Sequence, residues 1–277
     1  FSRSIADAGG SVRNAEANSR NHELTFEVTT GSTVTHRLKI VPDASIERKV
    51  GHLALIIDDL EISDKEISQR FLRIERPLTF SINPWRDSAE KQAREVDGQN
   101  QEVIIHLPME PDSYPRISPG RHAVLVNQSP LQNKRVVQDA VAALPMARGV
   151  KNFMGSRATS QRNVMEPVLR EVKDSNKYFV DSMTSSRSVA HKTAEQLEIP
   201  GGVSWGFLDA EDNQERIAAR LDQASLAAMK AGPVILVARA RANTLVVLEE
   251  KMQRLALRGI QFVHASTLVT GGKDAGS

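Results

Sequence analysis

One short stretch, Val103-Ile104-Ile105-His106-Leu107-Pro108-Met109-Glu110-Pro111, combines a buried strand with polar side chains that suit an active site. Its apolar start is typical of a strand that is buried on both faces. The strand carries His106 at its end, and Glu110 follows four residues later. Because the flanking prolines fix the backbone, the pattern favours a functional role for His106 over a purely structural one.

Short apolar runs of the same kind recur after residue 51, and helical patterns separate most of them. The strand candidates are Leu53–Ile57, Leu78–Ile82, Val103–Ile105, Val150–Asn152, Tyr178–Val180, Val234–Val237 and Gln261–Val263. The main helical patterns are Gln132–Ala143, Val164–Lys173, Gln214–Lys230 and Thr244–Leu257. Buried strands that alternate with amphipathic helices predict an α/β fold with a parallel sheet. About seven such units favour a (β/α) barrel over an open sheet.

The first 50 residues have a different pattern, which predicts a small accessory unit of α and β structure followed by a linker. A short helix is one option at Ser11–Arg20. Apolar and polar residues then alternate on both sides of Thr30-Gly31-Ser32, which predicts a β-hairpin with one buried face. We therefore expect an accessory unit at 1–50, a barrel at 51–270 and a flexible tail at 271–277. The proline-rich stretch Pro108–Pro130 is expected to be an insertion over one rim of the barrel.

Composition restricts the classes of function. A formal net charge of +2 is too small to favour nucleic acid, and 4% aromatic residues do not indicate a base-stacking surface. The chain has no cysteine, which excludes disulfides and thiolate metal sites and fits an oxidising compartment, although a cytoplasmic protein could equally lack cysteine. No apolar run approaches the roughly 18 residues of a transmembrane helix. The chain begins at Phe1, so any signal peptide or membrane anchor is expected upstream of it.

Polar residues follow most of the predicted strands, at the end of a parallel barrel where function collects. In chain order they are Asp58 and Asp59, Asn83, His106 with Glu110, Asn152, Asp181 with Ser182, and Arg239. Carboxylate and imidazole groups together suit zinc or a similar divalent ion. An aspartate beside such a ligand can act as the base that activates a metal-bound water. The alternative is that each aspartate only caps the next helix, and the convergence of the whole set favours the active site.

A competing motif, Gly202-Val203-Ser204-Trp205-Gly206, matches the G-x-S-x-G nucleophile elbow. An elbow needs a strong strand before its serine and a helix directly after it. Here Ile199-Pro200-Gly201 is a poor strand, and the next helical pattern begins several residues late. Asp222 and His264 follow in the correct order for a triad, but the local pattern favours a glycine-rich turn.

Five blocks of the sequence resemble, in the right order, the signature blocks of the divergent polysaccharide deacetylases. They are Asp58-Asp59-Leu60, His106-Leu107-Pro108-Met109-Glu110-Pro111, Met154-Gly155-Ser156, Asp181-Ser182 with Thr184, and Phe207-Leu208-Asp209. The resemblance runs from about His52 to Val269, and the second block is the specific one. It implies a distorted (β/α) barrel that uses a divalent, zinc-like ion to remove acetyl groups from envelope glycans. It also implies an exported protein, either periplasmic or anchored to the membrane outside the cytoplasm.

The chain departs from this family pattern at three places. Glu61 replaces the glycine of D-D-L-G, Phe153 replaces the histidine of N-H-M-G-S, and Ala238-Arg239-Ala240-Arg241 replaces G-H-P-H. The expected metal ligands are thereby reduced to Asp59 and His106, with Glu110 as a third candidate. A guanidinium about 4 Å from a unit positive charge costs roughly 4 kcal/mol at an effective dielectric constant of about 20. Arg239 is expected either to pair with Asp58, Asp59 or Asp181, or to extend into solvent.

Two functions are compatible with these residues. The first is a metal-dependent deacetylase with Asp58 and Asp181 as its catalytic carboxylates. The second is a non-catalytic barrel with a lost or altered metal site, which binds an envelope glycan or an envelope protein. We favour the second slightly, because lost ligands are difficult to replace. In either case the side chains expected to contact the substrate or partner are Asn83, Glu110, Asn152, Ser156 and Arg239.

Overall fold

The computed structural model describes residues 2–19, 22–43 and 49–269, and the chain divides into two units, Phe1–Arg48 and Lys49–Ser277. Each unit contains its own sheet, and the two are described separately. The predicted flexible tail at 271–277 and most of the predicted linker lie outside the described residues.

The first unit is a short helix followed by a three-stranded antiparallel sheet. Its elements are α1 (Ser2–Asp7), β1 (Ser11–Asn18), β2 (Glu23–Thr30) and β3 (Thr33–Ile40), and the strands pair in the order β1-β2-β3. The hairpin of β2 and β3 is the one the alternation predicts. The helix considered at Ser11–Arg20 is wrong, because these residues pair with β2 along a ladder that is interrupted by a bulge near Asn14.

The buried face expected for this hairpin is only partly present. Phe26 is buried, whereas Leu24, Leu38 and Ile40 are 36%, 36% and 50% exposed. The alternation of apolar and polar residues therefore predicts these strands correctly. It also predicts a more fully buried apolar face than the strands have within this unit.

The second unit is a closed barrel of seven parallel strands, which confirms the predicted fold class. Its strands are β4 (Gly51–Asp58), β5 (Thr79–Ile82), β6 (Glu102–Met109), β7 (Gly149–Met154), β8 (Tyr178–Asp181), β9 (Gly201–Phe207) and β10 (Val234–Arg239). Each strand pairs with the next, and β10 pairs back onto β4 from Val234↔Leu53 to Arg239↔Asp58. The register of this closure places Asp58 and Arg239 side by side at the carboxyl end of the barrel.

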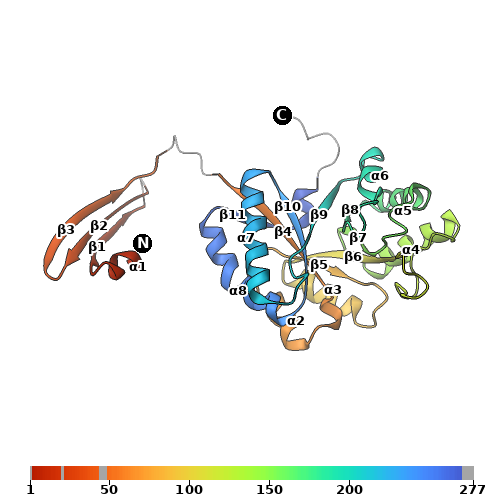
Figure 1. Cartoon of the computed structure of the whole chain (residues 1–277), viewed down its shortest axis with the longest axis horizontal. Helices are drawn as coiled ribbons and strands as arrows, with labels where there is room; N and C mark the ends of the chain where they lie inside the picture. The colour runs from red at the N-terminus through yellow and green to blue at the C-terminus, as the bar shows by residue number, and fades with distance from the viewer. Residues whose placement is uncertain (1, 20–21, 44–48, 270–277) are drawn as a thin grey trace. The chain divides into compact units, whose positions relative to one another are not determined.

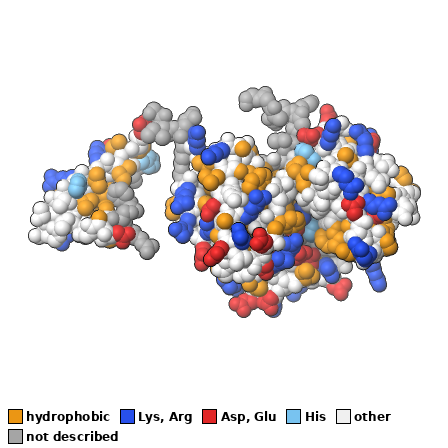
Figure 2. Space-filling view, viewed as in Figure 1, with side chains coloured by type: hydrophobic (Ala, Val, Ile, Leu, Met, Phe, Trp, Pro, Cys, Tyr) orange, Lys and Arg blue, Asp and Glu red, His pale blue; other side chains and the backbone are white. Residues whose placement is uncertain are grey.

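Helices surround the ring of strands (Figure 1). They are α2 (Lys65–Leu72), α3 (Ala89–Gly98), α4 (Pro130–Ala143), α5 (Arg162–Asp174), α6 (Ala190–Gln196), α7 (Gln214–Lys230) and α8 (Ala242–Leu257), with a 3-10 turn at Leu60–Ile62 and a short α9 at Ala265–Leu268. Among the described residues, no helix combines the length and apolar character needed to cross a bilayer. Acidic and basic side chains are interspersed over the visible face of the barrel unit (Figure 2).

Two strand assignments differ from the expectation. Gly201–Phe207 is strand β9 of the barrel, so the glycine-rich turn predicted there is wrong. Ser204 lies inside this strand, and its Oγ accepts a hydrogen bond from the Gly206 amide at 3.0 Å. The serine is therefore not at a strand-to-helix turn, and this position is not a nucleophile elbow.

The strand β11 (Ile260–Val263) is not one of the seven barrel strands, although the sequence pattern counts it among them. It pairs with Gly51–Ala54 of β4, while β5 pairs with Ile56–Asp58 of the same strand. Because β10 occupies the opposite edge of β4 over both segments, β5 and β11 share one edge in succession.

Side-chain alternation along the strands sorts residues to the inside and outside of the barrel. Ala54, Ile56, Ile104, Val180 and Val237 belong to one small apolar cluster, whereas their strand neighbours pack in the larger cluster with the helices. Continuing this alternation to the carboxyl ends of β4, β6, β7 and β8 turns Asp58, His106, Lys151 and Ser182 toward the interior. The apolar interior thus ends in a polar layer at the mouth.

Candidate functional site

The polar layer at the barrel mouth is organised around the ammonium group of Lys151. Its Nζ lies 2.9 Å from Asp58 Oδ2, 3.0 Å from His106 Nε2 and 3.4 Å from Ser182 Oγ. The Lys151 side chain is 1% exposed, and those of Asp58 and His106 are each 5% exposed. Three strands and the residue directly after a fourth therefore contribute one side chain each to a single buried cluster.

Burial sets the protonation of this cluster. It raises the pKa of Asp58, an effect opposed by the charge and hydrogen bond of Lys151. It lowers the pKa of His106 well below the usual 6.5, and the neighbouring Lys151 lowers it further. His106 is consequently neutral at physiological pH, and its Nε2 accepts the hydrogen bond from the Lys151 ammonium. Asp58 supplies the negative charge that a buried ammonium requires.

Phe153 covers one side of the cluster. Its ring meets the His106 ring edge-on, with centroids 4.9 Å apart and planes at 71°. This geometry is a favourable aromatic contact. The residue that replaces a motif histidine thus packs against the histidine that remains.

Arg239 lies in a second group of charges at the mouth. Its Nε is 3.9 Å from Asp59 Oδ2, its Nη1 is 3.5 Å from Asp209 Oδ1, and its guanidinium stacks 4.7 Å above the Phe207 ring. Asp209 is fully buried and also accepts hydrogen bonds from the Arg239 amide and the Thr244 hydroxyl. Of the pairings expected for Arg239, only that with Asp59 occurs, and its closer partner, Asp209, is one the sequence did not suggest.

Two further carboxyl groups, Asp59 and Glu61, lie at the same end of the barrel. Burial raises the pKa of Asp59, and the charge of Asp58 raises it further. Burial also raises the pKa of Glu61, to about 7. Glu61 Oε1 accepts a hydrogen bond from the Asn83 amide at 3.3 Å, so this side chain is held against the start of the loop after β5.

Four of the predicted site residues hold loops and strands in place and do not join the cluster. Asp181 accepts hydrogen bonds from Met183 N, Ser188 Oγ and His191 N, which matches the capping alternative. Glu110 binds Arg157 and the Val126 amide at 2.7 Å each. Asn152 bonds to Ser182 N and Met154 O, and Ser156 accepts from Asp112 N. Asn83, by contrast, lines a cavity beside the mouth.

Lys151 is the central residue that the sequence analysis missed. A usable signal was present, because Gly149-Val150-Lys151-Asn152-Phe153-Met154 places a lysine within a strand of a parallel barrel. Both faces of such a strand are covered, and an unpaired lysine there is very costly. A buried strand that carries a lysine therefore predicts an acidic partner inside the barrel.

The residues at the mouth do not fit a resident divalent cation. Asp58 Oδ2 and His106 Nε2 both face an ammonium group, and the nearest cation to Asp59 is the guanidinium of Arg239. Within the described ranges, no three His, Cys, Asp or Glu side chains are grouped so that they could hold a metal ion. A positive ion added here would have to displace or repel Lys151.

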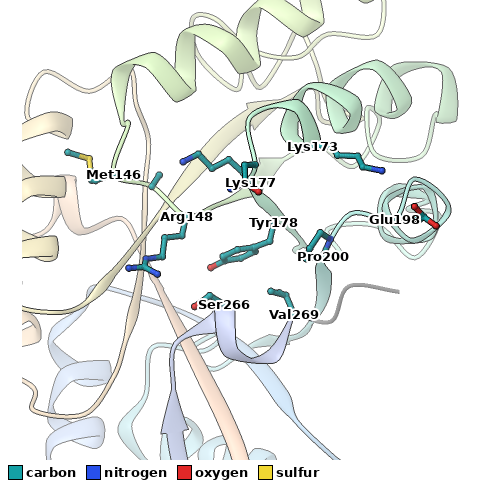
Figure 3. A pocket seen from close by; sticks show the side chains of 11 residues that line it. Met146, Arg148, Lys173, Lys177, Tyr178, Glu198, Pro200, Ser266 and Val269 are labelled. Atoms are coloured by element: carbon teal, nitrogen blue, oxygen red, sulfur yellow. The ribbon is translucent and has the colours of Figure 1, made fainter. Parts of the chain in front are cut away.

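Another cavity of the barrel unit lies at the opposite end of the strands. It has a volume of about 780 Å³ and includes Arg148, Lys173, Lys177 and Tyr178 in its walls. Figure 3 shows Arg148 and Lys173 pointing to opposite sides, and Lys173 Nζ bonds to the Leu197 carbonyl at 2.6 Å. Burial lowers the pKa of Lys177, and the charge of nearby Arg148 lowers it further. None of the site residues expected from the sequence lines this cavity, so it is not the candidate site.

A closed parallel barrel with a buried polar cluster at the carboxyl ends of its strands defines an enzyme-like (β/α)-barrel protein. The chain matches the family model described as divergent polysaccharide deacetylase over residues 55–269, and it belongs to that family. The resemblance drawn from the signature blocks is thereby confirmed. An uncharacterized protein of Haemophilus influenzae is 29% identical over 221 residues, which cover 78% of this chain and 76% of the relative.

Solved structures share this fold. ATU2773 from Agrobacterium tumefaciens has a TM-score of 0.74 at 25% identity, over 82% of this chain and 92% of that one. BA3943 of Bacillus anthracis, described as a CE4 family pseudoenzyme, has a TM-score of 0.51 at 13% identity, over 97% of this chain and 93% of that one. A mutant of BA3943 is described as having restored enzymatic activity. At so low an identity, the likeness to BA3943 shows the fold alone.

Proposed function

We propose that this chain binds an envelope glycan at the barrel mouth without hydrolysing it, and that Lys151 has taken the place of a catalytic metal ion. One observation carries the proposal: the Lys151 ammonium contacts both Asp58 Oδ2 and His106 Nε2 inside the barrel. An aspartate and a histidine bind a metal cation through these same oxygen and nitrogen atoms. The ammonium satisfies both of them, so the fold keeps its charge balance without a metal.

The same contacts remove the groups that hydrolysis requires. A general base must accept a proton from water, and it must reach that water. The Asp58 carboxylate is buried against Lys151, and the Nε2 lone pair of His106 is already engaged by the same ammonium. The neighbouring family structure described as a pseudoenzyme supports the idea that this fold persists without activity.

Binding remains available at the mouth because its outer residues are partly exposed. The side chains of Asp59 and Arg239 are 32% and 30% exposed. A cavity lined by Asn83, Trp85 and Phe153 adjoins His106, because the Phe153 ring contacts the His106 ring. We place the protein outside the cytoplasm, where such glycans occur. The small net charge supports the proposal that nucleic acid is not its partner.

A zinc titration combined with two glycan assays tests this function. Calorimetry on the metal-free full chain is expected to show no zinc binding tighter than about 1 µM. Chitotetraose, an acetylated glucosamine tetramer, is expected to bind without release of acetate.

Zinc binding tighter than about 1 µM that disappears in His106→Ala, together with acetate release, would establish the alternative, an active metal-dependent deacetylase. Failure to bind any acetylated or acidic glycan at millimolar concentration would also contradict the proposal and favour a protein partner.

A further inference from the structure

A second, smaller cavity lies beside the polar cluster at the mouth. Its volume is about 290 Å³, and its walls come from three separate segments of the chain. The lining residues are Asn83, Trp85 and Arg86 after β5, Ser118, Pro119, Gly120 and Arg121 in the insertion after β6, and Phe153 and Met154 at the end of β7. The predicted insertion over the rim thus supplies one wall of this cavity.

Phe153 contacts both this cavity and the candidate site. The Phe153 ring lines the cavity and also contacts the His106 ring at 4.9 Å. Asn83 also lines this cavity, and its backbone N–H donates a hydrogen bond to Glu61 at the mouth. A ligand in the cavity therefore lies next to the place where related barrels are expected to act on a sugar.

One wall of the cavity offers an aromatic surface. Trp85 is half-buried, and its ring lies 5.0 Å from the His122 ring at an interplanar angle of 43°. The two rings are tilted against each other and the indole N–H is buried, so the ring surface that Trp85 offers to a ligand is apolar and suits the apolar face of a sugar.

The charged residues that line this cavity are basic. Its lining includes two arginines, Arg86 and Arg121, and no acidic residue. Both arginines are exposed, and within the described part of the chain neither lies within 4.0 Å of a carboxylate. Other loop arginines of this barrel do find such partners, since Arg157 pairs with Glu110 and Arg187 pairs with Asp112. Two unpaired guanidinium groups beside an aromatic wall fit a ligand that brings its own carboxylate.

We infer that this cavity selects acidic glycans, in which a sugar carries a carboxylate that binds Arg86 and Arg121 while the ring packs near Trp85. The inference rests on the proposed glycan-binding function and specifies its ligand. A neutral sugar would occupy the same space without the charge-assisted hydrogen bonds.

Two tetrasaccharides that differ in their carboxylates test the inference by calorimetry on the full chain. The acidic probe alternates N-acetylglucosamine and N-acetylmuramic acid, and the neutral probe is chitotetraose. At low salt the acidic probe is expected to bind about tenfold more tightly than chitotetraose. Each exposed guanidinium–carboxylate contact contributes modestly to the binding free energy, and the contributions of the two arginines are summed. At about 0.5 M salt this preference is expected to fall to about threefold or less.

The double variant Arg86→Gln/Arg121→Gln is expected to weaken binding of the acidic probe about tenfold and binding of chitotetraose by about twofold or less. Arg148→Gln is the matched control, since Arg148 is also exposed but lies at the other end of the strands. Equal affinity of the wild type for both probes, or an unchanged affinity of the double variant, overturns the acidic preference and leaves glycan binding intact. Binding of neither probe contradicts the proposed function itself.

Discussion

At the level of single residues, Lys151 is the centre of the buried polar cluster at the barrel mouth. A buried ammonium needs a negative partner and hydrogen-bond acceptors, and Asp58, His106 and Ser182 supply them. Phe153 and Arg239 cannot bind a metal ion, but their presence does not by itself explain how the buried Asp58 carboxylate is neutralised. Lys151 provides that explanation.

Removing the ammonium should leave a buried, uncompensated carboxylate. Lys151→Met is expected to lower the free energy of unfolding at pH 7 by about 3–5 kcal/mol. Urea unfolding followed by tryptophan fluorescence measures this change, because both tryptophans, Trp85 and Trp205, are in the barrel unit. In the variant the raised pKa of Asp58 has no cation to oppose it, so the loss should shrink as the pH falls and the carboxyl protonates.

The double variant Asp58→Asn/Lys151→Met is the control for this experiment. It removes both charges, and it is expected to be more stable at pH 7 than Lys151→Met alone. If the two variants are equally unstable at every pH, then lost packing and not the unpaired charge explains the effect.

Glu61 should make barrel stability depend on pH. Its pKa is raised from 4.5 to about 7, so its contribution is fully present below pH 4.5 and is lost as the pH rises through 7. A 2.5-unit shift corresponds to at most about 3 kcal/mol, and partial exposure reduces this to about 2 kcal/mol. Glu61→Gln should therefore match the wild type near pH 4.5 and exceed it by about that amount at pH 8, as measured by urea unfolding. A constant difference between the two proteins at both pH values would show that Glu61 does not titrate in this way.

At the level of secondary-structure elements, the strands arrange the site by alternation. The sequence pattern located six of the seven barrel strands, because their short β-branched runs are unambiguous. It missed β9, where Gly201, Gly202 and Pro200 obscure the strand and where tertiary pairing to β8 and β10 sets the conformation. It predicted that Asp58, Asp59, His106 and Arg239 would share one end of the barrel, since the direction of parallel strands fixes this.

Alternation also explains where the site prediction was incomplete. Asp181 and Asn152 are at strand ends, but each directly follows a residue whose side chain points into the barrel, Val180 and Lys151 respectively. Because side chains alternate along a strand, Asp181 and Asn152 point away from the interior. Loop hydrogen bonds, such as those of Glu110 and Ser156, depend on contacts between distant segments. Such contacts cannot be derived from local patterns.

The tight approach of β7 and β8 offers a test at this level. A Cβ atom on Gly149 would lie 2.5 Å from the Tyr178 ring, and the Tyr178 hydroxyl is held by Glu102 at 2.9 Å. Gly149→Ala should therefore destabilise the barrel by about 2 kcal/mol in urea unfolding. Gly98→Ala is the control, since its added Cβ would meet nothing within 4 Å apart from its own helix, and it should be neutral or slightly stabilising. Equal stabilities for the two variants would contradict the described packing of β7 on β8.

At the level of the whole molecule, the barrel retains a deacetylase architecture around an internal ion pair. Closure by β4 and β10 places Asp58 beside Arg239, and the insertion after β6 adds a wall to the cavity beside Phe153. The family relationship explains the architecture, whereas the identity of a few interior side chains decides whether a metal ion can bind.

A crystal of the full chain grown with excess zinc, with diffraction recorded at the zinc absorption edge, tests the central claim most directly. We expect no anomalous peak inside the barrel, and density for Lys151 Nζ within hydrogen-bond distance of Asp58 and His106. An anomalous peak bound by Asp58 or Asp59 together with His106, with the lysine displaced, would contradict the account.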